Sequence, residues 1–164
     1  MDSMLDQVLS VIRPFSEDLF DLDRGPLFID TNYLELRDDV NFHQTKWHMF
    51  KETQEYLIAT NGDISTGEWE HVSGNKIIIG RSTRDGVLYE LAFLDEDFFI
   101  LSRHGNTRAT ERKYFMLVRE PLAKQLEWHE AITYLFDKYR NSNNFIVTVA
   151  IIVILIIAIV LLLS

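Results

Sequence analysis

Histidine, serine and carboxylate side chains are the groups of this chain that could do chemistry, and their spacing predicts no catalytic or metal site. The chain contains five histidines and no cysteine. No two histidines lie three or four residues apart, the spacing that puts two metal ligands on one helix face. No serine has the Gly-x-Ser-x-Gly context of a hydrolase nucleophile, and no glycine-rich phosphate loop is present. We therefore predict that the protein is not an enzyme, with no catalytic residue, no cofactor and no metal.

The densest acidic cluster of the sequence is Asp95-Glu96-Asp97. An Asp-x-Asp pair could begin a calcium or magnesium site, because these cations take several oxygen ligands. Here Phe98 follows at once, and the cluster contains no glycine. The pattern therefore favours a charged hairpin turn between two apolar strands.

Basic residues gather in the segment from 103 to 119, where Glu111 is the only acidic residue. Such a segment could contact nucleic acid, but the acidic sequence pI of about 4.9 argues against that partner. It could instead face anionic lipid headgroups, or pair with the first 45 residues, which carry ten acidic and three basic residues. We favour the pairing within the chain. The basic residues concerned are Arg103, Arg108, Arg112, Lys113 and Arg119.

The elements that must position these side chains are mainly β-strands. Short apolar runs alternate with turn residues such as Asn61-Gly62-Asp63, a pattern typical of consecutive antiparallel hairpins. Two of the runs, 87–94 and 98–102, are apolar on both faces, so the meander is predicted to curl into a small barrel or to be covered on its second face. The seven predicted strands are 46–50, 56–60, 67–72, 76–81, 87–94, 98–102 and 114–119.

Amphipathic helices flank this up-and-down meander, so the predicted fold class is mainly β with flanking helices (α+β). Apolar residues recur at helical spacing from Met4 to Ile12 and again from Leu122 to Tyr139. The predicted organisation is an amphipathic N-terminal helical segment at 1–26, an acidic connector at 27–45, a β-meander domain at 46–120, a juxtamembrane amphipathic helix at 121–140 and a transmembrane helix at 145–163.

The run from Phe145 to Leu163 has the sequence of a membrane-spanning helix. Apart from Thr148 and two alanines it consists of Leu, Ile, Val and Phe, with no charge, glycine or proline. As a helix it would be roughly 28 Å long, close to the ~30 Å hydrocarbon core of a bilayer. The run therefore predicts a single-pass anchor in a lipid bilayer.

The residues around this run predict its orientation. Asp2 and Asp6 stand where a secretory signal carries basic residues, so we expect no cleaved signal and a tail-anchored layout. Lys138 and Arg140 precede the run, and only Ser164 follows it. By the positive-inside rule, the bulk of the chain is expected on the cytoplasmic side of the membrane.

An anchor and a β domain without a catalytic set predict a protein that binds something at the membrane surface. The first interpretation is protein–protein interaction or scaffolding, in which the acidic N-terminal third favours a basic protein partner. The alternative is a membrane-tethered barrel that binds a small ligand or a lipid. Its aromatic lining could equally form a packed core. The lining residues concerned are Trp47, Trp69, Tyr89, Phe93 and Phe99.

Overall fold

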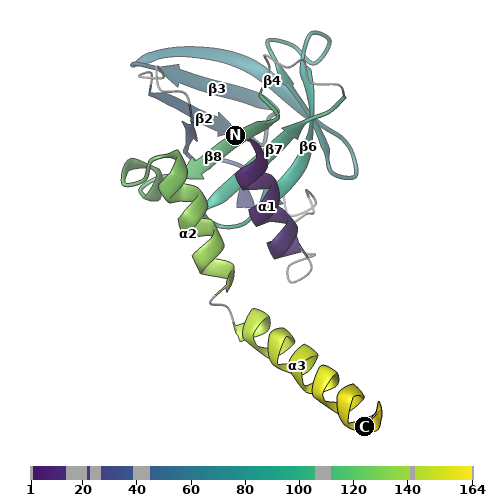
Figure 1. Cartoon of the computed structure of the whole chain (residues 1–164). Helices are drawn as coiled ribbons and strands as arrows, with labels where there is room; N and C mark the ends of the chain where they lie inside the picture. Colours follow the sequence, from purple (N-terminus) through teal and green to yellow (C-terminus); the bar gives the residue numbers. More distant parts are fainter. Residues whose placement is uncertain are drawn as a thin grey trace.

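Eight antiparallel strands close into an up-and-down barrel, in which each strand pairs with the next and the last returns to the first (Figure 1). β1 closes the barrel, because it pairs with β2 on one side and with β8 on the other. The strands are β1 (Tyr33–Leu36), β2 (Lys46–Phe50), β3 (Glu55–Thr60), β4 (Asp63–Ser73), β5 (Lys76–Gly80), β6 (Val87–Leu94), β7 (Phe98–Arg103) and β8 (Tyr114–Arg119).

Three α-helices accompany the barrel. The structure is a computed structural model that describes residues 2–13, 22, 27–38, 45–105, 112–140 and 143–163. A short 3-10 turn precedes the second α-helix. At the start of that helix, the Glu130 carboxylate accepts a hydrogen bond from the backbone N–H of Glu127 at 2.8 Å. The helices are α1 (Asp2–Ile12), η4 (Leu122–Lys124), α2 (Trp128–Arg140) and α3 (Asn143–Leu163).

The mainly β, antiparallel meander predicted from the sequence is confirmed, and its sheet is closed into a barrel. The predicted number of strands was wrong by one, because β1 lies in the segment assigned to the acidic connector. β1 is only four residues long, and it buries the charged side chain of Glu35. A charge on the inner side hides the alternation that reveals a strand in a sequence.

The middle of the barrel is a packed aromatic core. The ring of Phe99 stacks on that of Phe28 with centroids 4.8 Å apart, and Phe50 and Trp69 meet Phe28 edge-on at 5.9 and 5.4 Å. Phe28 comes from the segment before β1, which joins the barrel through a bridge between Ile29 and Phe50. Rings at these separations are in direct contact, so the barrel is filled by its own side chains at this level.

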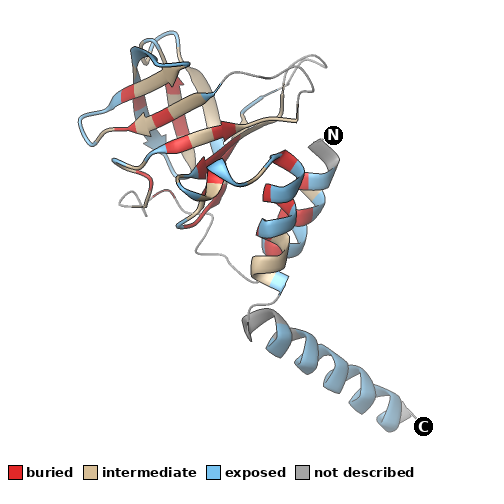
Figure 2. Ribbon diagram, turned by 90° about the vertical axis from the view of Figure 1, so that its left-hand side faces the viewer, coloured by how far each residue is buried: buried red, intermediate tan, exposed pale blue. Residues whose placement is uncertain are grey.

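A second core lies outside the barrel, where α1 and α2 cover the outer face of β6, β7 and β8 (Figure 2). α1 contributes Leu5 and Ile12 to this layer, and α2 contributes Ile132 and Leu135, all at most 1% exposed. Burial of each such side chain contributes about 1.5–3 kcal/mol, which is enough to hold both helices on the strands. β6, β7 and β8 are therefore apolar on both faces: their inner faces pack in the closed barrel, and their outer faces pack against the helices.

A β-bulge in β6 moves Phe93 to the outer side of the barrel. The pairing of β6 with β7 shifts register between Leu91 and Phe93. Leu91 belongs to the interior core, whereas Phe93 is fully buried in the outer core, where its ring meets Tyr139 edge-on at 5.4 Å. A strict two-residue period puts both side chains on one face, so the predicted place of Phe93 in the barrel lining was wrong.

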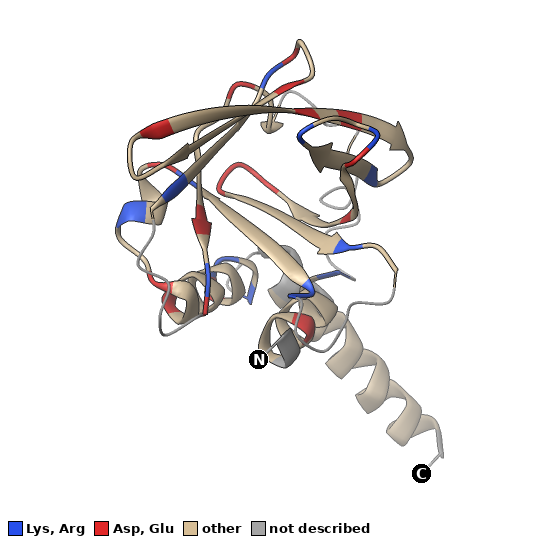
Figure 3. Cartoon of the chain, turned by 90° about the horizontal axis from the view of Figure 1, so that it is seen from above, with Lys and Arg blue, Asp and Glu red and all other residues tan. Residues whose placement is uncertain are grey.

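α3 extends away from the barrel and from the other two helices (Figure 1). All of its described side chains are exposed. It carries no charge, in contrast with the barrel, over which acidic and basic residues are interspersed (Figure 3). Judged on the described residues alone, no helix combines the length and the apolar character that a membrane crossing requires.

Candidate functional site

The inward side chains of several strands change from apolar to polar toward one end of the barrel. In β1, Tyr33 belongs to the interior core and the inward position two residues later is Glu35. In β2, Phe50 belongs to the core, and His48 and Lys46 precede it at the same two-residue spacing. Because β1 and β2 are antiparallel, their polar positions meet at the same end.

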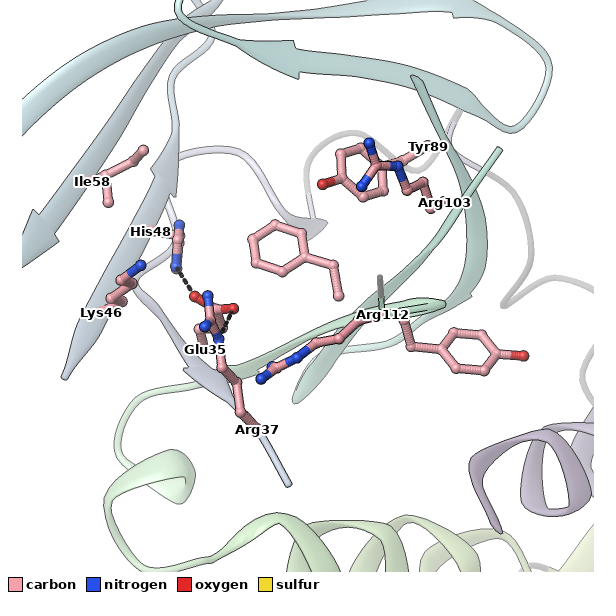
Figure 4. Close-up of a pocket in the computed structure, with 10 residues that line it drawn as sticks. Glu35, Arg37, Lys46, His48, Ile58, Tyr89, Arg103 and Arg112 are labelled. Atoms are coloured by element: carbon pink, nitrogen blue, oxygen red, sulfur yellow. Dashed lines mark hydrogen bonds and ion pairs between the residues drawn. The ribbon is translucent and has the colours of Figure 1, made fainter. Parts of the chain in front are cut away.

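These side chains surround an open cavity of about 330 Å³ at that end of the barrel (Figure 4). Six strands (β1, β2, β3, β6, β7 and β8) contribute to its walls, together with the segments just after β1 and just before β8. The polar lining consists of Glu35, Arg37, Lys46, His48, Arg103 and Arg112, and the remaining walls of Ile58, Tyr89, Tyr114 and Phe115.

The cavity is strongly cationic. Arg37, Lys46, Arg103 and Arg112 line it, against the single carboxylate of Glu35. Figure 4 shows Arg37 and Arg112 reaching the region beside Glu35, with Arg103 across the cavity from them. Apolar walls and partial enclosure strengthen the field of such charges relative to water. The lining therefore brings the N–H donors of four cationic side chains to one cavity.

A buried chain of three side chains forms one wall of the cavity. His48 Nδ1 lies 2.5 Å from the Tyr56 hydroxyl oxygen, and His48 Nε2 lies 3.3 Å from the Glu35 carboxylate. Glu35 is 7% exposed, and His48 and Tyr56 are each 4% exposed. A carboxylate only accepts hydrogen bonds, so the ring donates from Nε2 to Glu35, and its Nδ1 pairs with the Tyr56 hydroxyl. Glu35 also accepts from Nε of Arg37.

This network determines the protonation of its carboxyl and its phenol. Burial alone would raise the pKa of Glu35, but hydrogen bonds from His48 and Arg37 outweigh burial and hold that pKa below its ordinary value. Burial, with the nearby charge of Glu35, raises the pKa of Tyr56 well above its ordinary value. Glu35 is therefore ionised and Tyr56 neutral at pH 7. Both ring nitrogens of His48 are engaged inside the wall, so the ring is not placed to take a proton from a molecule in the cavity.

Helix α1 holds one rim of the cavity in place. Asp6 accepts a hydrogen bond from Lys113 Nζ at 2.5 Å and another from the Tyr114 hydroxyl. The hydrogen bond to Asp6 is the main cause of the raised pKa of Lys113, and burial followed by the same carboxylate raises the pKa of Tyr114 to about 12. Arg112 comes immediately before this pair. Through Asp6, α1 thus fixes the segment that carries one of the cavity's cations.

The predicted basic segment is divided among several surroundings. Arg103 and Arg112 both line the cavity. Lys113 instead faces α1, and Arg119 donates to a backbone carbonyl in the β6–β7 turn at 3.4 Å. Arg108 lies outside the described residues. The structure therefore brings two of these five residues together at one site.

The aromatic residues predicted to line a barrel are also separated. Trp69 and Phe99 are buried in the interior core, and Tyr89 lines the cavity. Trp47 faces outward beside a small apolar recess, and Phe93 lies in the outer core. Tyr89 is thus the member of this set that is placed to contact a ligand.

The acidic residues 95–97 form the turn between β6 and β7 and surround an ammonium group. Lys138 of α2 lies 3.0 Å from the carboxylate of Asp95 and 2.6 Å from that of Asp97. Arg140, the second predicted topology determinant, forms an ion pair within α2 at 3.1 Å. Within the part of the chain that the structure describes, no group of three or more histidine or acidic side chains could hold a metal ion.

Most of the cavity's polar residues escape sequence reasoning. Glu35, Arg37, Lys46 and His48 belong to no motif, and each looks like an ordinary surface residue in the sequence. One signal is present in β2, whose inward side chains are Lys46, His48 and Phe50. The inner face of this strand is thus apolar at one end and polar at the other. Such a change marks the open end of a barrel.

Comparisons with known proteins assign no family to this chain. No family model matches the chain, and neither the curated proteins nor the solved structures include a significant match to it. A fold on its own does not imply a function, so a function has to be inferred from the side chains of the site.

Proposed function

We propose that this protein is a membrane-anchored β-barrel that binds a small anionic molecule in the open end of its barrel. The observation that carries the proposal is the cavity of about 330 Å³, in which four cationic side chains face one carboxylate. Pockets for small molecules typically measure about 300–1,000 Å³. Lysine and arginine side chains donate charge-assisted hydrogen bonds to anionic groups, so a lining rich in them suits an anionic ligand.

The walls of the cavity support a ligand with an acidic end and an apolar body. Ile58 and Phe115 offer apolar contact beside the cations, and Tyr89 adds an aromatic face. Below them, Leu101 and Leu117 are fully buried in the interior core and limit the depth of the site. A molecule the size of a single substituted ring suits this space better than a long acyl chain does.

Isothermal titration calorimetry of the full chain in a neutral detergent tests this function. We expect small aromatic anions to bind, and phenol, which is neutral, to bind more weakly. Arg103→Gln should weaken anion binding about tenfold, the effect of losing one charge-assisted hydrogen bond. Arg84→Gln, which removes an exposed arginine outside the cavity, is the matched control and should change the affinity less than about twofold. Equal binding of phenol, or no binding of any anion, would refute the proposal.

Protein–protein interaction is the second candidate, and a specific surface favours it. An apolar recess of about 190 Å³ lies on the outer face of β2 and β3, on strands that α1 and α2 leave uncovered. Its rim includes Ile64, which is 75% exposed. Loss of binding through Ile64→Asp, with Arg103→Gln harmless, would point to this recess instead of the cavity. The apolar side chains of the recess are Trp47, Met49, Leu57, Ala59 and Ile64.

We further propose that α3 anchors the barrel in a lipid bilayer. The support is the uninterrupted apolar run Phe145–Leu163, which is longer than the stretch of α3 whose side chains are described. The described side chains are all exposed, and in water they would form a continuous apolar surface. Lys138 and Arg140 precede the run and favour a cytoplasmic barrel, because the positive-inside rule counts Lys and Arg and depends little on acidic neighbours.

The anchor and its orientation are tested with one variant. The chain has no cysteine, so Ser73→Cys introduces a single thiol in an exposed strand end. We expect the protein to stay with membranes in alkaline carbonate, and the thiol to react with an impermeant maleimide only after the cells are permeabilised. Extraction by carbonate would contradict the anchor, and labelling of intact cells would contradict the orientation.

A further inference from the structure

We infer that two copies of this chain associate through the first half of β4, which forms an unpaired strand edge in the barrel wall. β4 is 11 residues long, whereas β5 has 5 residues. β4 pairs with β5 only from Glu68 onward, where it faces Gly80, the last residue of β5. Among the described strands, residues 63–67 therefore have β3 on one side and no neighbour on the other. This association does not depend on the ligand of the cavity.

The backbone groups on the open side of this edge belong to Ile64 and Thr66. Successive residues of a strand direct their N–H and C=O groups to opposite sides. The N–H of Trp69 donates to the carbonyl of Gln54 at 2.9 Å, on the side of β3. The pairing of β4 with β3 is regular over residues 63–68, so the odd-numbered residues point to β3. The even-numbered Ile64 and Thr66 therefore point their N–H and C=O groups to the open side.

The segment 63–67 lacks the features by which proteins usually protect a sheet edge, namely basic side chains, proline and bulges. Residues 64–67 read Ile-Ser-Thr-Gly, without charge or proline, in a chain whose formal net charge is −9. The irregular pairing of β4 lies farther along the strand, between His71 and Ser73. Residues 63–66 are all exposed, and Ile64 is 75% exposed. The edge is thus open to an added strand.

The loop between β5 and β6 turns back before it reaches this edge. A Cβ atom on Gly80 would lie 2.5 Å from the Cα of Gly86, so the two ends of the loop are in contact. The backbone N–H of Thr83 donates to the Glu68 carboxylate at 3.1 Å, which holds the loop beside the residue where β5 ends. In Figure 1, β3 and β4 lie at the opposite end of the molecule from α3, so the proposed anchor does not cover the edge either.

A second copy of the same edge fits it, because the segment is complementary to itself. In an antiparallel pair of β4 strands with Ser65 opposite its own counterpart, Ile64 of each copy faces Thr66 of the other. These residues then exchange N–H and C=O hydrogen bonds in both directions. Asp63 faces the uncharged Gly67, so the pair brings no like charges together. On the outer face the two Ile64 side chains are diagonal neighbours, which joins the apolar recesses of the two barrels.

Disulfide cross-linking in membranes tests this association. The chain has no cysteine, so Ser65→Cys introduces a single thiol opposite its counterpart in the dimer. Residues in such a non-hydrogen-bonded pair have Cα atoms about 4.5 Å apart, a separation that a disulfide spans. We expect the full chain in phosphatidylcholine vesicles, oxidised with copper phenanthroline, to form dimers at least about tenfold faster through Ser65→Cys than through Ser73→Cys. Ser73 is the matched control, because it is exposed at the other end of β4. Equal rates would exclude a second copy as the occupant of the edge.

Further variants test the backbone pairing and its register. Added to Ser65→Cys, Thr66→Pro removes an N–H on the open side without touching the bonds to β3, and should slow cross-linking about tenfold. Thr66→Ala keeps the N–H and should leave the rate unchanged, with circular dichroism confirming that both variants are folded. Ile64→Cys alone should cross-link more slowly than Ser65→Cys, because its counterpart lies ~7–8 Å away on the diagonal. Undiminished cross-linking in a folded Thr66→Pro variant, or faster cross-linking through Ile64→Cys, would overturn the inference.

Discussion

Replacing Asp95 by alanine is expected to lower the free energy of unfolding by about 3–5 kcal/mol, because a buried carboxylate with several partners is removed. Asp95 is 4% exposed. One of its oxygens accepts from the backbone N–H groups of Asp97 and Phe98, at 2.8 and 2.7 Å. The other accepts from Lys138 Nζ at 3.0 Å and from the Tyr139 hydroxyl at 2.7 Å. The variant therefore loses both the cap of the β6–β7 turn and its bonds to α2.

Chemical denaturation of the full chain in detergent, followed by circular dichroism, measures this effect. Glu96→Ala is the matched control, since the Glu96 side chain is 72% exposed and lies 3.4 Å from the same ammonium group. An exposed pair of this kind contributes about 0–1 kcal/mol. Similar losses in the two variants would mean that Asp95 acts only as one more surface charge.

The second large effect concerns Glu35, for which stability and ligand affinity should change in opposite directions. We expect Glu35→Gln to lower the free energy of unfolding by about 2–3 kcal/mol, because His48 and Arg37 lose a charged acceptor inside the wall. The same change removes the one negative charge of the cavity lining. Anions should therefore bind about threefold to tenfold more tightly. Calorimetry and denaturation on one preparation give both numbers, and a fall in affinity together with stability would contradict this account of the cavity.

The stability difference between this variant and the wild type should depend on pH with a definite sign. The network holds the pKa of Glu35 below the ordinary value of a glutamate. A carboxyl whose pKa is lowered by folding stabilises the protein above its unfolded pKa and loses that contribution as the pH falls through the folded value. The difference should thus be present near neutral pH and shrink below about pH 4. A difference that grows on acidification would show that the charge of Glu35 destabilises the fold.

Much of the fold could be predicted from the sequence, because most strands carry strong local signals. Turn residues divide the chain from β2 to β8 into consecutive hairpins. The seven predicted strands match the centres of the seven strands β2 to β8. β1 was missed, since four residues with Glu35 turned inward give no clear alternation. Phe93 was misplaced because a bulge changes the period inside an otherwise regular strand.

The candidate site was largely hidden for a different reason. Arg103 and Arg112 stood out as part of a basic segment, but Glu35, His48 and Lys46 come from other strands and meet them only when the barrel closes. No local pattern encodes that meeting, because it depends on the register of long-range strand pairs. The type of fold therefore followed from local rules, while the site required the closed topology.

Closure of the barrel also restricts how this protein can associate. An open sheet presents unpaired N–H and C=O groups along its outer strands, and extended peptides or identical chains can add to them. Here β1 pairs with both β2 and β8, so the described strands form a ring in which each has two neighbours. The four residues of β1 thereby protect two longer strands from templated strand addition. Closure thus removes most of the described strand edges from templated addition, which favours partners that recognise side chains on the strands, the helices or the mouth.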